Sequence, residues 1–104
     1  MQLVEDFMSL CQDFLQQDTS VLVSIEQFFG DLWVEEGILH FSLPALYQYL
    51  ISFSDDVESP DYKGFRQALY RSDFNTQLAI IGARIDVHDS SGKADSSIYR
   101  LVKI

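Results

Sequence analysis

The side chains best suited to metal binding and proton transfer are two imidazoles, His40 and His88, and one thiol, Cys11. Neither histidine has a second His or Cys near it in the sequence, whereas a zinc site needs three or four converging nitrogen, sulfur or carboxylate ligands. His40 lies in an apolar stretch, which is typical of a structural residue. We therefore expect no metal site and no cofactor.

Phosphate binding and nucleophilic catalysis have equally weak support in the sequence. Ser91-Gly92-Lys93 resembles part of a phosphate-binding loop, but that loop needs an earlier glycine, a Ser or Thr after the lysine, and a following helix. No Ser lies in a G-x-S-x-G context. Acidic pairs such as Asp55-Asp56 lie in polar segments, whereas general acids need burial and a perturbed pKa. The sequence therefore predicts a protein that is not an enzyme.

The charged residues divide the chain into two parts. Residues 1–62 contain twelve Asp or Glu and no Lys or Arg, while residues 63–104 contain all seven basic residues and four Asp. The two parts carry net charges of −12 and +3 within a total of −9. Such an asymmetry indicates an interaction surface, and the simpler alternative is the solvated surface of an acidic domain. The acidic residues that we predict to bind a protein partner are Glu5, Asp6, Asp13, Asp18, Glu26, Asp31, Glu35 and Glu36.

Length and composition set the broad class of the protein. A chain of 104 residues with 47% hydrophobic residues predicts one compact globular domain. The sequence has one cysteine, nothing that resembles a signal peptide, and no apolar run of about 18 residues. We therefore expect a cytoplasmic protein with no membrane-spanning segment.

The first part of the chain shows helical periodicity. Residues 2–16 place their apolar side chains on one face with Cys11 among them, which predicts a helix and a buried thiol. A second helix is predicted after Asp18, with an apolar face that continues through Gly30 to Leu32 and Trp33, although the helix could also stop at the glycine.

A turn, a short extended segment and a third helix follow. Gly37 marks the turn and residues 38–41 the extended segment, while Pro44 begins a helix that extends to Phe53. Residues 45–53 are apolar nearly all round, which is typical of a buried central helix and, alternatively, of an interface.

The last part of the chain combines helices and strands. We predict helices at Pro60–Arg71 and Asp73–Ala83, strands at Arg84–His88 and Ile98–Ile104, and a polar loop at Asp89–Ser97. This order of elements resembles a winged helix-turn-helix, in which the second helix is the recognition helix and the loop is the wing. The resemblance covers residues 60–104 and is a pattern of elements rather than a residue motif.

The resemblance implies nucleic-acid binding as an alternative function. The recognition helix of such a domain enters the major groove, where Asn75, Thr76 and Gln77 would face base edges. The residues that would face phosphates are Lys63, Arg66, Arg71, Arg84 and Lys93. The predicted recognition helix carries no Lys or Arg, and the acidic part of the chain would repel a duplex. Many winged helices bind proteins instead.

Together these patterns predict an α+β fold in one domain, with an acidic helical part at residues 1–54 and a winged-helix-like part at residues 60–104. The favoured function is non-enzymatic binding: a regulator or adaptor that presents an acidic helical surface to a basic protein partner, in its narrowest form a DNA mimic. The alternative is a nucleic-acid-binding domain. A homodimer through aromatic surface around Trp33, Tyr47 or Tyr49 is a further expectation.

Overall fold

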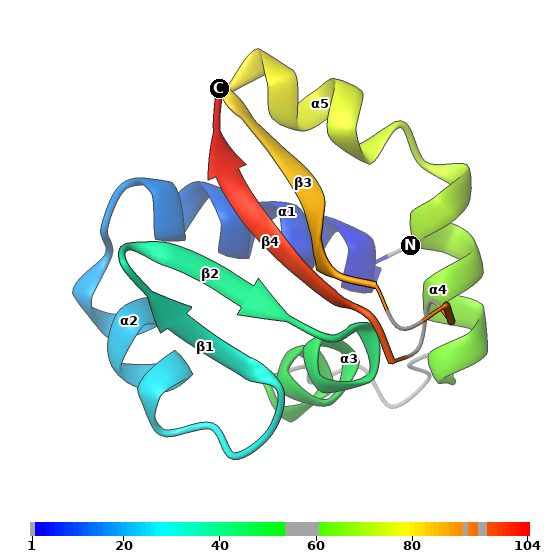
Figure 1. Cartoon of the computed structure of the whole chain (residues 1–104), viewed down its shortest axis with the longest axis horizontal. Helices are drawn as coiled ribbons and strands as arrows, with labels where there is room; N and C mark the ends of the chain where they lie inside the picture. Colours follow the sequence, from blue (N-terminus) through cyan, green and yellow to red (C-terminus); the bar gives the residue numbers. More distant parts are fainter. Residues whose placement is uncertain (1, 54–60, 91, 94–95) are drawn as a thin grey trace.

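Two β-hairpins, one from each half of the chain, join in a single antiparallel sheet (Figure 1). The computed structural model describes residues 2–53, 61–90, 92–93 and 96–104. In these residues the strands are β1 (Leu32–Glu35), β2 (Ile38–Phe41), β3 (Ala83–Asp89) and β4 (Ile98–Lys103), in the order β1-β2-β4-β3. The α+β class predicted from the sequence is confirmed, and the N-terminal half contributes two strands as well as helices.

Helices cover one face of this sheet. They are α1 (Gln2–Leu15), α2 (Thr19–Glu26), α3 (Leu43–Ser52), α4 (Tyr62–Arg71) and α5 (Phe74–Ile80). Figure 1 shows α1, α2 and α3 on the far side of the sheet and no described helix over the near side. Side chains of a strand alternate between faces, so one face of each strand joins the core and the other meets solvent.

The core lies between the covered face of the sheet and the helices. Phe7 of α1 is fully buried, and its ring stacks on Phe74 with centroids 4.6 Å apart. The same ring meets Phe41 of β2 edge to face at 5.5 Å. Burial of one such side chain contributes roughly 2–3 kcal/mol. This aromatic cluster therefore ties α1, α5 and the sheet together.

The predicted second helix was too long. It ends at Glu26, and Leu32 and Trp33 belong to β1 instead. Gly30 has a φ of +151°, and its carbonyl accepts a hydrogen bond from Leu32 N–H, so the chain turns here into a strand. Leu32 and Trp33 fit a helical arc in the sequence, but as consecutive strand residues they point to opposite faces of the sheet.

Most other elements lie where the sequence predicts them, with shifts at their ends. Ser42 caps α3 through its hydroxyl, which accepts a hydrogen bond from Ala45 N–H at 3.2 Å. Asp61 caps α4, while the predicted start at Pro60 lies outside the described residues. The last helix ends at Ile80 rather than Ala83, because Gly82 (φ +81°) forms the turn into β3.

Candidate functional site

Three helices of the acidic half enclose a surface groove of about 430 Å³. Asp6, Ser9 and Asp13 of α1 lie along one side, at spacings that place them on one helical face. Leu10 of α1 also lines the groove, and the remaining lining residues come from α2, α3 and the residue after α3: Ser20, Val21, Ser24, Tyr49, Leu50 and Phe53. We call this feature the acidic groove.

The acidic groove combines an apolar floor with a negative rim. Leu10 and Leu50 are buried in its floor, and Phe53 is 64% exposed at its end. None of the described residues that line it is Lys or Arg. Asp6 accepts a hydrogen bond from the Gln2 side chain at 2.8 Å, and Asp13 is exposed. The groove therefore offers carboxylates beside apolar surface.

Asp18 serves the fold directly. Its carboxylate accepts hydrogen bonds from the Ser20 hydroxyl at 2.6 Å and from the backbone N–H groups of Ser20 and Val21, which caps α2. The hydroxyl of Ser20, followed by the Val21 N–H, lowers the pKa of Asp18. This residue therefore has a structural role in addition to any part in binding.

The structure distributes the other predicted acids over several elements. Glu5 lies on the exposed side of α1, and Glu26 is the last residue of α2. Asp31 precedes β1, while Glu35 and Glu36 lie at the β1–β2 turn, and all five of these residues are exposed. Of the eight predicted acids, the packing of α1 against α2 and α3 brings Asp6 and Asp13 into the acidic groove.

The predicted phosphate-facing residues lie on three parts of the C-terminal half. Lys63, Arg66 and Arg71 belong to α4, where the Arg66 guanidinium lies 5.7 Å from the centre of the Tyr62 ring. Arg84 of β3 forms an ion pair with Asp86 at 3.1 Å. Lys93 is exposed in the segment between β3 and β4. The ion pair partly neutralises one member of this set.

The predicted base-reading residues lie on α5. Thr76 and Gln77 are exposed. The Asn75 amide instead pairs with the backbone of β3, because its oxygen accepts the Ile85 N–H at 2.8 Å and its nitrogen donates to the Ile85 carbonyl at 3.4 Å. In this conformation the donor and the acceptor of Asn75 are both engaged within the chain.

The two histidines, 48 positions apart in the sequence, lie together in the structure. Their rings meet edge to face with centroids 4.7 Å apart on the uncovered face of the sheet. His40 is 4% exposed, stacks on Trp33 at 5.1 Å, and donates from Nδ1 to the Ile38 carbonyl at 3.0 Å. Strand pairing also places His40 opposite Arg100. Within the described residues, no group of three or more metal-binding side chains converges.

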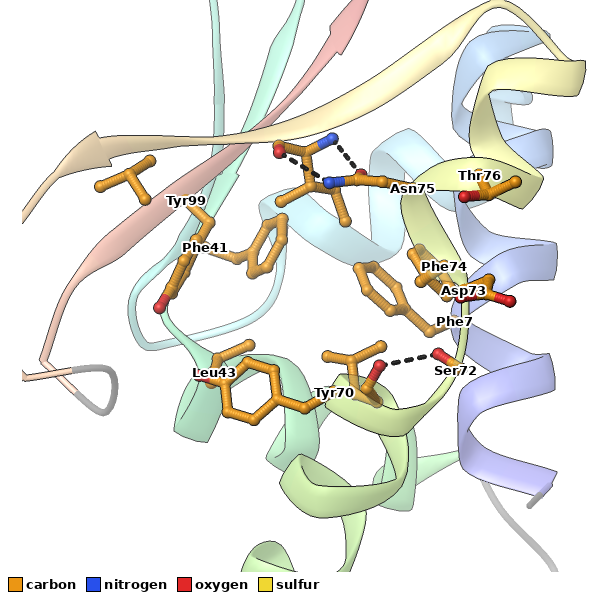
Figure 2. A pocket seen from close by; sticks show the side chains of 13 residues that line it. Phe7, Phe41, Leu43, Tyr70, Ser72, Asp73, Phe74, Asn75, Thr76 and Tyr99 are labelled. Carbon is orange, nitrogen blue, oxygen red and sulfur yellow. Dashed lines mark hydrogen bonds between the residues drawn. The ribbon is translucent and has the colours of Figure 1, made fainter.

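A second hollow lies between α4, α5 and the β3–β4 hairpin (Figure 2). Its volume is about 400 Å³, and five aromatic rings line it: Phe7, Phe41, Tyr70, Phe74 and Tyr99. We call it the aromatic pocket. No local pattern in the sequence predicts it, because the five rings come from five elements, α1, β2, α4, α5 and β4, and tertiary packing alone brings them together.

Comparison of the chain with models of protein families, with curated proteins and with solved structures gave no match. No helix among the described residues is long and apolar enough to cross a membrane. We therefore infer the function from the geometry of the acidic groove and from the distribution of charge.

Proposed function

We propose that this protein is a non-enzymatic cytoplasmic adaptor or regulator that binds a basic amphipathic helix of a partner protein in the acidic groove. The observation that carries this proposal is the pair Asp6 and Asp13, which line the same groove above the apolar residues Leu10 and Leu50. Residues 1–62 contain no Lys or Arg that would neutralise this surface.

The spacing of the two carboxylates specifies the partner further. Asp6 and Asp13 are two helical turns apart, which corresponds to about 10 Å along α1. A partner helix that lies along the groove would match them with Lys or Arg residues seven positions apart. Its apolar face would contact Leu10, Val21 and Leu50. Burial of apolar surface would supply most of the affinity, and the charges would increase the association rate and the specificity.

A designed peptide of leucine and lysine, with lysines seven positions apart, tests the proposal by calorimetric titration. We expect the double variant Asp6→Asn/Asp13→Asn to bind about tenfold more weakly than the wild type, because two charge pairs are lost. The control Glu5→Gln/Glu26→Gln removes the same charge from exposed positions outside the groove. Equal losses of peptide affinity in the two double variants would show that the net charge of the protein, and not the acidic groove, determines binding.

Nucleic-acid binding is a second proposal, favoured by the order α4, α5, β3, β4 and by Lys63, Arg66 and Arg71 on α4. It has less support than the first proposal, because the Asn75 amide is engaged with β3. Titration of a labelled DNA duplex at about 50 mM salt tests it, since phosphate contacts are strongest at low salt. We expect Arg66→Glu/Arg71→Glu to abolish any binding, and the absence of binding by the wild type would remove this proposal.

A further inference from the structure

The two histidine rings meet across a strand that separates them. His40 belongs to β2 and His88 to β3, and β4 lies between these strands in the sheet. Two strand spacings amount to about 10 Å, yet the ring centroids are 4.7 Å apart, so both side chains lean over β4. His88 lies at a register shift between Val87 and Asp89, where β3 has one residue more than β4. Such bulges re-aim side chains and are common beside functional sites.

Arg100 of β4 lies on the same face of the sheet as the two rings. Strand pairing places it opposite His40 on β2 and Asp86 on β3, and cross-strand partners share a face. Among the described residues, its Nε atom is the one buried side-chain nitrogen or oxygen that lacks a hydrogen-bond partner. The carboxylate of Asp86 is engaged by Arg84 at 3.1 Å. A buried donor of a charged group without an acceptor is costly, and it indicates that a partner is missing.

An oxyanion fits this arrangement better than a metal ion does. The guanidinium of Arg100 repels cations, and its planar N–H groups pair with phosphate or carboxylate oxygens. His40 is 4% exposed and donates from Nδ1 to the Ile38 carbonyl, so its Nε2 accepts when the ring is neutral and donates when the ring is protonated. The guanidinium and two imidazolium rings would offer donors from three strands, which suits the several oxygens of a phosphate group more than the two of a carboxylate.

We propose that the uncovered face of the sheet binds a phosphate group, free or as a monoester of a small molecule, between His40, His88 and Arg100. Binding is coupled to protonation of the rings, because the lone pair of a neutral Nε2 repels an anion and histidine gains its proton between about pH 5 and 8. Figure 1 shows α1, α2 and α3 on the far side of the sheet. The phosphate site is therefore separate from the acidic groove, and each can exist without the other.

Other charges on this face weaken the site without blocking it. In the described strands they are Glu35 on β1 and Asp89 and the Arg84–Asp86 ion pair on β3. Glu35 accepts a hydrogen bond from the Trp33 indole at 3.4 Å. The net charge of −9 also opposes the approach of an anion. Salt screens charges that lie farther than about 8 Å at physiological ionic strength, so contacts with the guanidinium and the two rings determine the affinity.

Titration of the ¹⁵N-labelled protein with sulfate, at constant ionic strength, tests the proposal by NMR. Sulfate has the tetrahedral shape of phosphate, and its charge does not change between neutral and mildly acidic pH. The resonances to follow are those of the two imidazoles and of Trp33, the one tryptophan, which stacks on His40 at 5.1 Å. We expect saturable shifts and an affinity about tenfold higher at about pH 6 than at about pH 8. The absence of saturable shifts at the lower pH, or equal affinity at both, would overturn the proposal.

Variants of single residues identify the groups that bind the anion. Arg100→Gln should lower the affinity for sulfate at about pH 6 by about tenfold. Lys103→Gln is the matched control, because Lys103 is an exposed residue of the same strand on the opposite face, and it should bind as the wild type does. Asp89→Asn removes a carboxylate from the same face and should increase the affinity by about twofold. Equal losses in Arg100→Gln and Lys103→Gln would overturn the proposal. His88→Gln, at an exposed position, replaces Arg100→Gln if the latter does not fold.

Three further anions identify the chemical class of the ligand. Inorganic phosphate and glycerol 3-phosphate should both bind at about pH 6, and acetate should bind about tenfold more weakly. Tighter binding of glycerol 3-phosphate would identify a phosphate monoester as the ligand, and equal binding of the two would identify the free anion; either result supports the proposal. Acetate that binds as tightly as phosphate would contradict the choice of a phosphate group.

Discussion

The side-chain amide of Asn75 pairs with the backbone of Ile85 as a neighbouring strand would, through one accepted and one donated hydrogen bond. β3 is an edge strand of the sheet in the described residues, and unpaired backbone groups on an edge strand invite association with other chains. The amide therefore joins α5 to β3 and covers part of this edge.

Replacement of this amide is expected to destabilise the fold. Asn75→Ala removes both hydrogen bonds and should lower the free energy of unfolding by about 1–2 kcal/mol, as measured by urea denaturation. Thr76→Ala, at the next exposed position of α5, is the control and should change little. Equal stability of Asn75→Ala and the wild type would show that the pairing contributes nothing.

The Cys11 thiol is fully buried, and this burial raises the pKa of the thiol well above its usual value. The thiol should react with a water-soluble disulfide reagent only after unfolding. A raised pKa in the folded state stabilises the protein below the unfolded pKa of about 8.5, and this contribution falls above that pH by up to ~1.4 kcal/mol per unit. Cys11→Ala should show a weaker loss of stability between about pH 8.5 and 10. A native protein that reacts at the rate of a free thiol would contradict this account.

Asp18 caps α2, and the hydroxyl of Ser20 is the main cause of its lowered pKa. A carboxyl whose pKa is lowered in the folded state stabilises the protein at pH values above its unfolded pKa. This stabilisation is lost as the pH falls through the pKa of the folded state. Asp18→Ala should therefore be less stable than the wild type at neutral pH, and the difference should shrink in acid. Asp18→Asn keeps a capping oxygen and should retain most of the stability. Thermal melts of the three proteins at neutral and acidic pH provide the measurement.

The β1–β2 turn contains Glu36 and Gly37, both with positive φ values, of 54° and 76°. Turns with two such residues favour Asn followed by Gly. Glu36→Asn should therefore raise the free energy of unfolding by about 0.5 kcal/mol, and Gly37→Ala should lower it by about 1 kcal/mol. Chemical denaturation of both variants measures these changes. A lower free energy of unfolding for Glu36→Asn, or a higher one for Gly37→Ala, would contradict this description of the turn.

Local patterns in the sequence predicted the helices better than the sites. The apolar periodicity of residues 2–16 correctly predicted α1 and the burial of Cys11, because the apolar face of a single helix can be read from its own residues. The same criterion failed at Leu32 and Trp33, because their assignment depends on pairing with Phe41 and His40 of β2. Tertiary contacts override a weak helical signal of this kind.

The sites were harder to predict, because non-local packing assembles them. The charge pattern placed Asp6 and Asp13 among the eight predicted binding residues, but the groove that they line exists only once α1 packs against α2 and α3. His40 and His88 are far apart in the sequence and meet through the order of the strands. Neither convergence has a local signature that one sequence could reveal.

The central claim is that the acidic groove binds a basic amphipathic helix. Amide chemical shifts of the labelled protein, recorded during titration with the leucine–lysine peptide, test it most directly. The account predicts that the largest shifts map to groove residues, including Asp6, Asp13, Ser24 and Phe53. Shifts confined to α4 and the β3–β4 hairpin, or no saturable shifts at all, would contradict it.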